Sequence, residues 1–187
     1  IEYDPNRSSY ISLVIYNIGK MAYVLSTEGV KVGDTIIASR ESSSNIKLGN
    51  SLTLRDIPVG TKVHNIEITP GTGGSLARAA GTFAKIIKQE RGEVTLRVKS
   101  KREIIVSELC MATIGVSSKS DYKNIKGGNA GYSRYLGKRP HVRGVAMNPI
   151  DHPHGGGEGK TSGGRISVTP WSIPTKGYKT KRKHIRK

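Results

Sequence analysis

Glu93-Val-Thr-Leu-Arg-Val-Lys-Ser100 is the stretch that most clearly indicates the fold of this 187-residue chain. Its even-numbered positions from 94 to 98 are apolar, and its odd-numbered positions from 95 to 99 are polar or charged. Such an alternation is typical of a β-strand with one buried face and one face in water. The sequence therefore predicts a half-buried strand at this point.

Short apolar runs on both sides of this strand extend the pattern. They cover residues 63–68, 82–88, 103–107 and 112–116, and Gly, Pro, Ser and charged residues separate them. Five short strands within about 60 residues favour a small barrel or sandwich. We expect this second unit to span residues 61–118.

The first 60 residues show similar short runs. In residues 10–16, alternate positions are aliphatic, and the turn at residues 17–19 leads into residues 21–25, which predicts a β-hairpin. We expect further strands at residues 30–38 and 51–54. This first unit should end near residue 60, so the chain is predicted to be all-β.

Charge is distributed unevenly along the chain. The sequence has 31 Lys and Arg against 14 Asp and Glu, which gives a net charge of +17. Residues 1–118 carry 15 basic and 11 acidic side chains, whereas residues 119–187 carry 16 basic and 3 acidic side chains. The second range also holds 12 of the 23 glycines. We therefore expect residues 119–187 to form an extended basic Gly-rich arm that orders on a polyanion.

The composition favours nucleic acid over other partners. A membrane-spanning helix needs about 20 consecutive apolar residues, and the longest apolar runs here are strand-sized, such as residues 104–106. The single Cys110 excludes an internal disulfide and a multi-cysteine zinc site, and it suits a reducing compartment. We expect a nucleic-acid partner and no membrane.

The stretch from Arg139 to Lys160 combines three consecutive glycines with His, Asn, Pro and Met. Glycine lets the backbone approach a phosphate ridge and offer its N–H groups. A flexible linker is the alternative, but linkers seldom mix these residue types. Trp171 and several tyrosines interleave with basic residues towards the tail at 176–187, as stacking groups for RNA would.

Enzymatic and metal sites fit this stretch poorly. Gly159-Lys160-Thr161 matches the end of a P-loop, but that pattern requires a glycine at the position of His154. Asp151, His152 and His154 lack further ligands at metal-site spacing, and the chain has no nucleophile elbow. RNA contact is favoured for the two histidines, and a structural hydrogen bond is left open. We expect no enzyme and no cofactor.

The chain resembles the ribosomal L2 family over nearly its whole length. The segments that carry the resemblance are residues 1–7, 73–81, 139–159 and 168–171. The resemblance implies that residues 1–60 form an OB-fold-like RNA-binding barrel, which could be incomplete, and that residues 61–118 form an SH3-like barrel. Residues 119–187 would be the rRNA-binding arm and tail.

The same resemblance implies a structural constituent of the large ribosomal subunit. Its partners would be large-subunit rRNA, other ribosomal proteins and the small subunit across the intersubunit interface. The family supports subunit association and the architecture around the peptidyl-transferase centre, where RNA performs the chemistry, and the histidine matching His152 has been tied to that activity. A soluble translation or transcription factor is the rival hypothesis, and the long basic arm argues against it.

The residues and the resemblance together give the candidate RNA-binding residues. They are Arg78, Lys138, Arg139, Arg143, Asn148, His152, His154, Gly155, Gly156, Gly157, Lys160, Arg165, Trp171, Lys176 and Lys179.

Three departures from the family pattern lead to further expectations. The chain is expected to lack the family's N-terminal segment, and a separate polypeptide carrying that segment could be a partner. Ser172 stands where the family usually has glycine. The insert at residues 161–165 is similar to alphaproteobacterial or mitochondrial forms, so we favour the mitochondrial matrix over the bacterial cytoplasm.

Overall fold

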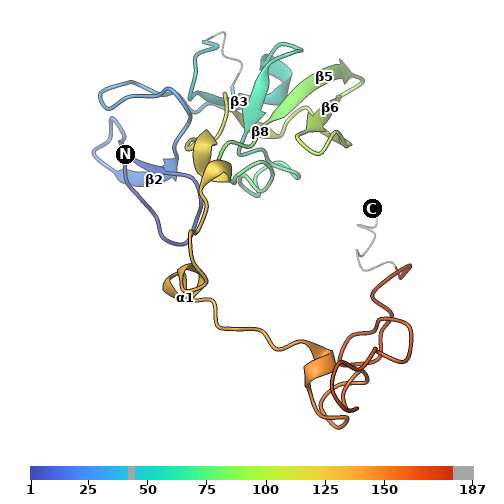
Figure 1. The fold of residues 1–187 in the computed structure, drawn as a ribbon. Helices are drawn as coiled ribbons and strands as arrows, with labels where there is room; N and C mark the ends of the chain where they lie inside the picture. The colour runs from blue at the N-terminus through green and yellow to red at the C-terminus, as the bar shows by residue number, and fades with distance from the viewer. Residues whose placement is uncertain (42–44, 179–187) are drawn as a thin grey trace. The chain divides into compact units, whose positions relative to one another are not determined.

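The computed structural model describes residues 1–41 and 45–178 (Figure 1). The chain divides into two compact units, residues 1–125 and residues 126–187. Lys179, the last of the candidate RNA-binding residues, lies outside the described residues.

The first unit holds the regular strands of the described chain, and all of their pairings are antiparallel. The strands are β1 (Ile11–Ile15), β2 (Met21–Leu25), β3 (Ser51–Thr53), β4 (Lys62–His64), β5 (Ala84–Glu90), β6 (Glu93–Val98), β7 (Glu103–Ser107) and β8 (Met111–Ile114). The short helical turns of this unit are η1 (Leu54–Asp56) and η2 (Ser120–Asn124), and those of the second unit are α1 (Tyr132–Tyr135) and η3 (Gly144–Ala146). The prediction of mainly β structure is confirmed.

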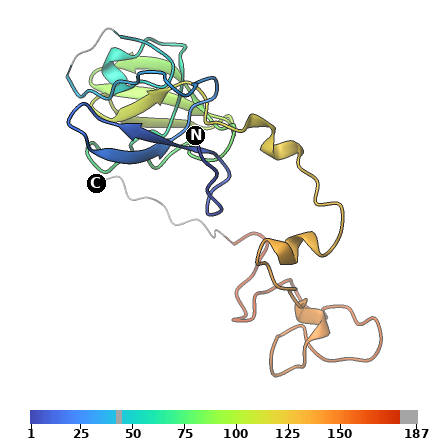
Figure 2. The same ribbon diagram turned by 90° about the vertical axis from the view of Figure 1, so that its left-hand side faces the viewer.

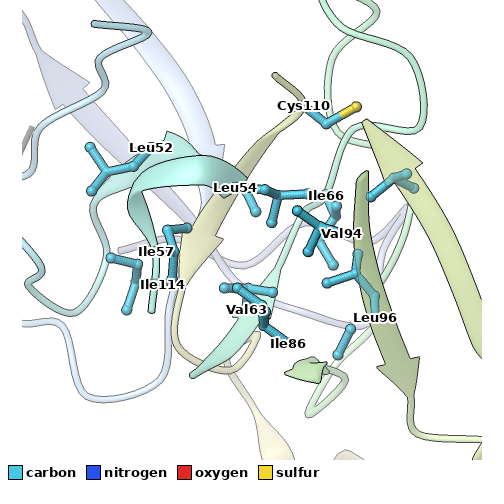
Figure 3. Close-up of a cluster of buried hydrophobic side chains, with 13 residues drawn as sticks. Leu52, Leu54, Ile57, Val63, Ile66, Ile86, Val94, Leu96, Cys110 and Ile114 are labelled. Carbon is cyan, nitrogen blue, oxygen red and sulfur yellow. The ribbon is translucent and has the colours of Figure 1, made fainter. Parts of the chain in front are cut away.

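β6 confirms the alternation from which its strand was predicted. The side chains of Val94 and Leu96 are fully buried, while Arg97 faces water. β6 pairs with β5 on one side and with β7 on the other. Figure 3 shows Val94 and Leu96 among the aliphatic side chains of the core, which also takes in Leu54 and Ile66.

The six-stranded sheet has the order β3-β8-β4-β5-β6-β7. β3 comes from the range expected to form the first barrel, yet it pairs with β8 at the end of the second range. The ranges 1–60 and 61–118 therefore share one sheet within the unit of residues 1–125. Their description as two separate barrels stays a prediction.

The predicted hairpin at the start of the chain is confirmed as β1 and β2, the two-stranded sheet seen in Figure 2. Leu13 pairs with Tyr23 in its register, and the Tyr16 N–H donates to the Lys20 carbonyl across the turn (2.8 Å). Gly19 occupies the turn with a φ of 78°, a conformation that glycine adopts without strain.

Two predicted strands were wrong in part. Residues 30–38 form a loop that contacts a strand only where Ala38 bridges to Ser51, because the rest of this segment has no neighbour to pair with among the described residues. Val32 is accordingly 84% exposed. The strand predicted at residues 63–68 ends at His64, because Asn65 takes a left-handed φ of 49° that interrupts pairing.

A buried histidine joins the hairpin region to the six-stranded sheet. His64 in β4 is fully buried, and its Nε2 lies 3.3 Å from Oγ1 of Thr27, which follows β2. Its Nδ1 has no hydrogen-bond partner among the described residues. Burial lowers the pKa of His64 to about 4, although the nearby backbone of Gly115 and Thr113 partly offsets this effect. The ring is therefore uncharged at neutral pH.

The second unit is built mainly from turns and loops. Apart from α1 and η3, residues 126–178 contain no regular helix or strand. Residues 143–175 are nevertheless closed by internal hydrogen bonds, so this part of the arm is more folded than the expected extended arm. The second compact unit begins at residue 126, so residues 119–125, which include η2, fall in the first unit. The boundary of the arm at residue 119 stays a prediction. None of the helices in the described ranges is long and apolar enough to cross a membrane.

Candidate nucleic-acid interface

Residues 143–175, which we call the histidine loops, form a set of turns stacked on one another. The first turn is η3, in which the Ala146 N–H donates to the Arg143 carbonyl (2.9 Å). In the second turn the Asn148 carbonyl accepts hydrogen bonds from the N–H groups of Asp151 (3.0 Å) and His152 (3.2 Å). These turns place the two histidines in the interior of the loops.

The rings of His152 and His154 stack, with centroids 5.1 Å apart and planes inclined by 25°. The Val168 N–H donates to Nε2 of His154 (3.0 Å), so Nδ1 of that ring carries the proton and donates to the Gly163 carbonyl (3.1 Å). The His154 N–H donates in turn to Nδ1 of His152 (3.0 Å). His154 therefore ties together three segments of the loops.

This geometry separates the roles of the two histidines. Both ring nitrogens of His154 make hydrogen bonds inside the loops, which is the structural alternative to RNA contact considered from the sequence. Neither ring nitrogen is therefore free to bond to RNA. His152 is only 7% exposed, but its Nε2 makes no hydrogen bond to a described residue. Nε2 of His152 is thus free to make a further hydrogen bond.

Several glycines of the histidine loops are required by close packing. A Cβ on Gly155 would lie 2.3 Å from the Asn148 carbonyl oxygen, and one on Gly157 would lie 2.2 Å from Oγ1 of Thr161. A Cβ on Gly144 would lie 2.5 Å from the His152 ring. No side chain fits at these positions without moving its neighbours.

This packing corrects the expected use of the backbone N–H groups in the glycine run. The Gly155 N–H donates to the His152 carbonyl (2.8 Å), and the Gly156 N–H donates to the Met147 carbonyl (3.1 Å). These two groups are therefore already satisfied and cannot cradle a phosphate. Within the described chain, no hydrogen bond of the Gly157 N–H is found. The absence of side chains at residues 155–157 allows this close packing of the loops.

The charged candidates, by contrast, lie on the outside of the second unit. Lys138, Arg139, Arg143, Lys160, Arg165 and Lys176 are all exposed, as is Asn148. None of the six cations forms an ion pair with a described residue. The second unit thus presents uncompensated positive charge, which attracts a polyanion.

Trp171 lies at the tip of a tight turn within the histidine loops. The Thr169 N–H donates to the Ile173 carbonyl, and the Ser172 N–H donates to the Thr169 carbonyl (both 2.9 Å). Val168 and Pro174 form a bridge at the base, next to the hydrogen bond from Val168 to His154. Trp171 is 79% exposed. A large aromatic ring is thereby held in water on a fixed support.

Ser172 in this turn has a φ of 61°, in the left-handed region that favours glycine. We predict that Ser172→Gly stabilises the turn by about 0.5–1 kcal/mol, because released strain exceeds the added entropy of the unfolded chain. Amide exchange of Thr169 and residue 172 should slow roughly two- to fivefold. Ser162→Gly is the control, since Ser162 has no left-handed φ. Unchanged or faster exchange in Ser172→Gly would contradict the strain argument.

Arg78 lies in the first unit, beside a surface groove of about 420 Å³. Arg7, Tyr23 and Asn65 also line this groove. The Arg78 carbonyl accepts a hydrogen bond from Oγ of Ser9 (3.3 Å), so the N-terminal segment holds the loop that carries Arg78. Arg7 was missed as a candidate residue, although it lies within the opening segment that resembles the family.

A buried carboxylate shapes the loop that leads to Arg78. Glu67 is only 4% exposed and accepts hydrogen bonds from the N–H groups of Met111 (3.0 Å), Gly71 (3.2 Å) and Gly73 (3.1 Å). Burial alone would raise the pKa of Glu67, but these hydrogen bonds and the ion pair with Arg40 (3.2 Å) outweigh it and lower the pKa. Glu67 therefore stays charged and fixes the loop.

The two units offer cations, one exposed tryptophan and a groove, but the described residues contain no cluster of His, Cys, Asp or Glu that could hold a metal ion. Two family models match the chain. The model described as Ribosomal Proteins L2, C-terminal domain, matches residues 47–172, about two thirds of the sequence. The chain belongs to the ribosomal protein L2 family. The model described as Ribosomal Proteins L2, RNA binding N-terminal domain, matches residues 1–38.

Curated relatives in this L2 family agree with the match. The chain is 51% identical to the large ribosomal subunit protein uL2 of Brucella canis over 181 aligned residues. These residues make up 97% of this chain and 65% of the Brucella protein. The chain is 52% identical to the protein of the same name from Sinorhizobium medicae, with the same coverage. The L2-family chain thus spans a little under two thirds of the length of these relatives.

Two expectations from the sequence are not supported by these comparisons. The match of residues 1–38 to the N-terminal domain model does not support an L2-family chain that lacks the N-terminal segment. The relatives named above are bacterial, so they do not support the preference for the mitochondrial matrix.

Proposed function

We propose that this L2-family chain is a structural constituent of the large ribosomal subunit that binds large-subunit rRNA. The observation that carries the proposal is the construction of the histidine loops. Both ring nitrogens of His154 are satisfied by internal hydrogen bonds, while the cations and Trp171 are exposed to water. RNA supplies both missing partners, because phosphates pair with the cations and an unpaired base stacks on the indole.

The proposal assigns different roles to the candidate residues. The six exposed cations of the second unit and Arg78 contact phosphates, and Trp171 stacks on a base. His154 and the glycines at 155–157 position the loops without a hydrogen bond from the His154 ring to RNA. His152 donates one hydrogen bond through Nε2, and Arg7 joins Arg78 at the groove. Lys179, which lies outside the described residues, is assigned a phosphate contact as Lys176 is.

The finer parts of the proposal follow from the family. The chain supports subunit association and the architecture of the peptidyl-transferase region, and the RNA carries the chemistry, so the chain is not an enzyme. Its protein partners are other ribosomal proteins, together with the small subunit across the intersubunit interface. Residence in the large ribosomal subunit is the proposed localisation. The bacterial relatives give no reason to place that ribosome in mitochondria.

Crosslinking tests this assignment of residues. We expect ultraviolet crosslinks between large-subunit rRNA and peptides that contain Arg143, Lys160 and Trp171, because these side chains are exposed. Peptides from the outer edge of the sheet, such as Glu103–Ser107, serve as the internal control because they are not assigned to RNA. Crosslinks confined to such control peptides would overturn the proposal.

A further inference from the structure

Four residues outside the groove and the histidine loops converge on one point of the first unit. The Nζ atom of Lys119 lies 5.2 Å from the ring centroid of Tyr3, 4.9 Å from that of Tyr10 and 5.3 Å from that of Tyr122. We call these four residues the tyrosine cluster. Each distance is within the range of a cation–π interaction.

The tyrosine cluster is anchored to its surroundings by backbone hydrogen bonds. The Tyr10 N–H donates to Oγ of Ser118 (3.0 Å), and the Ser118 N–H donates to the Ser26 carbonyl (3.0 Å) after β2. The Tyr122 N–H donates to the Lys119 carbonyl (3.0 Å) at the start of η2. The Glu2 N–H, next to Tyr3, donates to the Ile11 carbonyl (2.7 Å). The three rings are thus carried by hydrogen-bonded backbone.

Lys119 itself has an unusual backbone conformation. Its φ of 62° and ψ of 50° are left-handed, a region that residues other than glycine and asparagine seldom adopt. The strained residue lies immediately before η2 and carries the cation at the centre of the cluster. Such strain persists where the surrounding structure or a bound partner compensates for it.

Two side chains of the tyrosine cluster remain open to solvent. Tyr3 is 64% exposed and Tyr122 is 44% exposed, so the ammonium group covers only part of each ring. No ion pair between Lys119 and a described carboxylate is found. The cluster therefore offers exposed aromatic surface around a cation without an anionic partner.

We infer that the tyrosine cluster binds one unpaired nucleotide of rRNA, with its base stacked on Tyr3 or Tyr122 and its phosphate beside Lys119. Aromatic rings next to a cation are the usual means of holding single-stranded RNA. The net charge of +17 favours RNA over a cationic ligand, and Lys119 already fills the place that such a ligand would take. The inference rests on the proposed rRNA binding and adds a contact to it.

Binding of in vitro transcribed large-subunit rRNA to the full chain tests the inference. We expect one of the two variants Tyr3→Leu and Tyr122→Leu, the one that removes the ring under the base, to weaken binding roughly 10-fold, the size expected for one lost stacking contact. Tyr122→Phe should bind normally, because it keeps the ring. Tyr16→Leu is the matched control, because Tyr16 has the same exposed fraction as Tyr122, 44%, and is not part of the cluster. It should bind as the unchanged chain does.

Salt dependence separates stacking from charge at this site. The Leu variant that weakens binding should shift the plot of log affinity against log salt without changing its slope. Lys119→Gln should reduce the slope by about one, as expected when one phosphate contact is lost. Thermal unfolding of each variant shows whether its fold is kept.

Crosslinking of the unchanged chain tests the inference if a Leu variant fails to fold. The unchanged chain bound to rRNA that contains 4-thiouridine should crosslink at the peptide with Tyr3 or at the peptide with Tyr122. If the unchanged chain does not bind rRNA, the proposed function itself fails. If the chain binds but both folded Leu variants bind equally well, or neither peptide crosslinks, the inference alone is overturned.

Discussion

We expect the affinity of the chain for large-subunit rRNA to fall by about 10³- to 10⁵-fold between roughly 50 and 200 mM salt, because 6–10 phosphate contacts release that many counterions. The six unpaired cations of the second unit, with Arg78 and Lys119 in the first, supply a number of this size. Binding measured at several salt concentrations gives the slope directly.

Single charge removals calibrate this slope. Lys160→Gln and Arg143→Gln should each reduce the slope by about one, because each side chain is exposed and has no ion-pair partner among the described residues. Lys88→Gln is the control and should leave the slope unchanged, since Nζ of Lys88 already pairs with Glu90 at 2.8 Å. A nearly flat salt dependence of the unchanged chain would contradict the phosphate contacts.

We also expect the first unit to lose about 3 kcal/mol of stability between neutral pH and pH 4 through His64. The pKa of this ring is lowered from 6.5 to about 4 in the folded chain. The unfolded chain therefore binds a proton over this window that the folded chain does not, so stability is full above pH 6.5 and falls with the pH down to about 4.

Chemical denaturation followed by circular dichroism measures this loss. About 2 kcal/mol should already be lost at roughly pH 5, before most carboxylates, including Glu67, become protonated. His141→Gln should leave the pH dependence unchanged, because His141 is exposed. His64→Gln should flatten it. Equal stability of the unchanged chain at neutral pH and pH 5 would show that the His64 ring accepts a proton without cost.

The strands that could be predicted from sequence are those with a local signal. The alternation in residues 94–98 and the turn at residues 17–19 correctly indicated β6 and the β1–β2 hairpin. Residues 30–38 are rich in β-branched residues, as strands are, but a strand also needs a neighbouring strand to pair with. The local sequence does not show whether such a neighbour is present. The pairing of β3 with β8 is equally non-local.

The RNA-binding roles of the candidate residues stay predictions, but the structure shows which of these residues are exposed and which make internal contacts. The basic residues of the second unit lie exposed, as a polyanion-binding surface requires. The glycine run and His154 look like ligands for phosphate in the sequence, yet their contacts with Asn148, Thr161 and Val168 are internal. Such packing depends on turns that bring together residues up to 14 positions apart.

Two features had no usable signal in the sequence. The sequence around His64 does not show that its ring is buried, because the burial depends on contact with Thr27, which follows β2, 37 positions earlier in the chain. The tyrosine cluster brings together residues 3, 10, 119 and 122, which only the folded first unit places side by side.

The most direct test of the proposed function is the sedimentation of the native protein. A structural constituent of the large subunit should migrate with that particle and remain bound through a moderate salt wash, with no appreciable free pool. A factor that acts in solution should instead stay mainly at the top of the gradient. We predict the first result, and a predominantly free protein in cells with intact ribosomes would contradict the account.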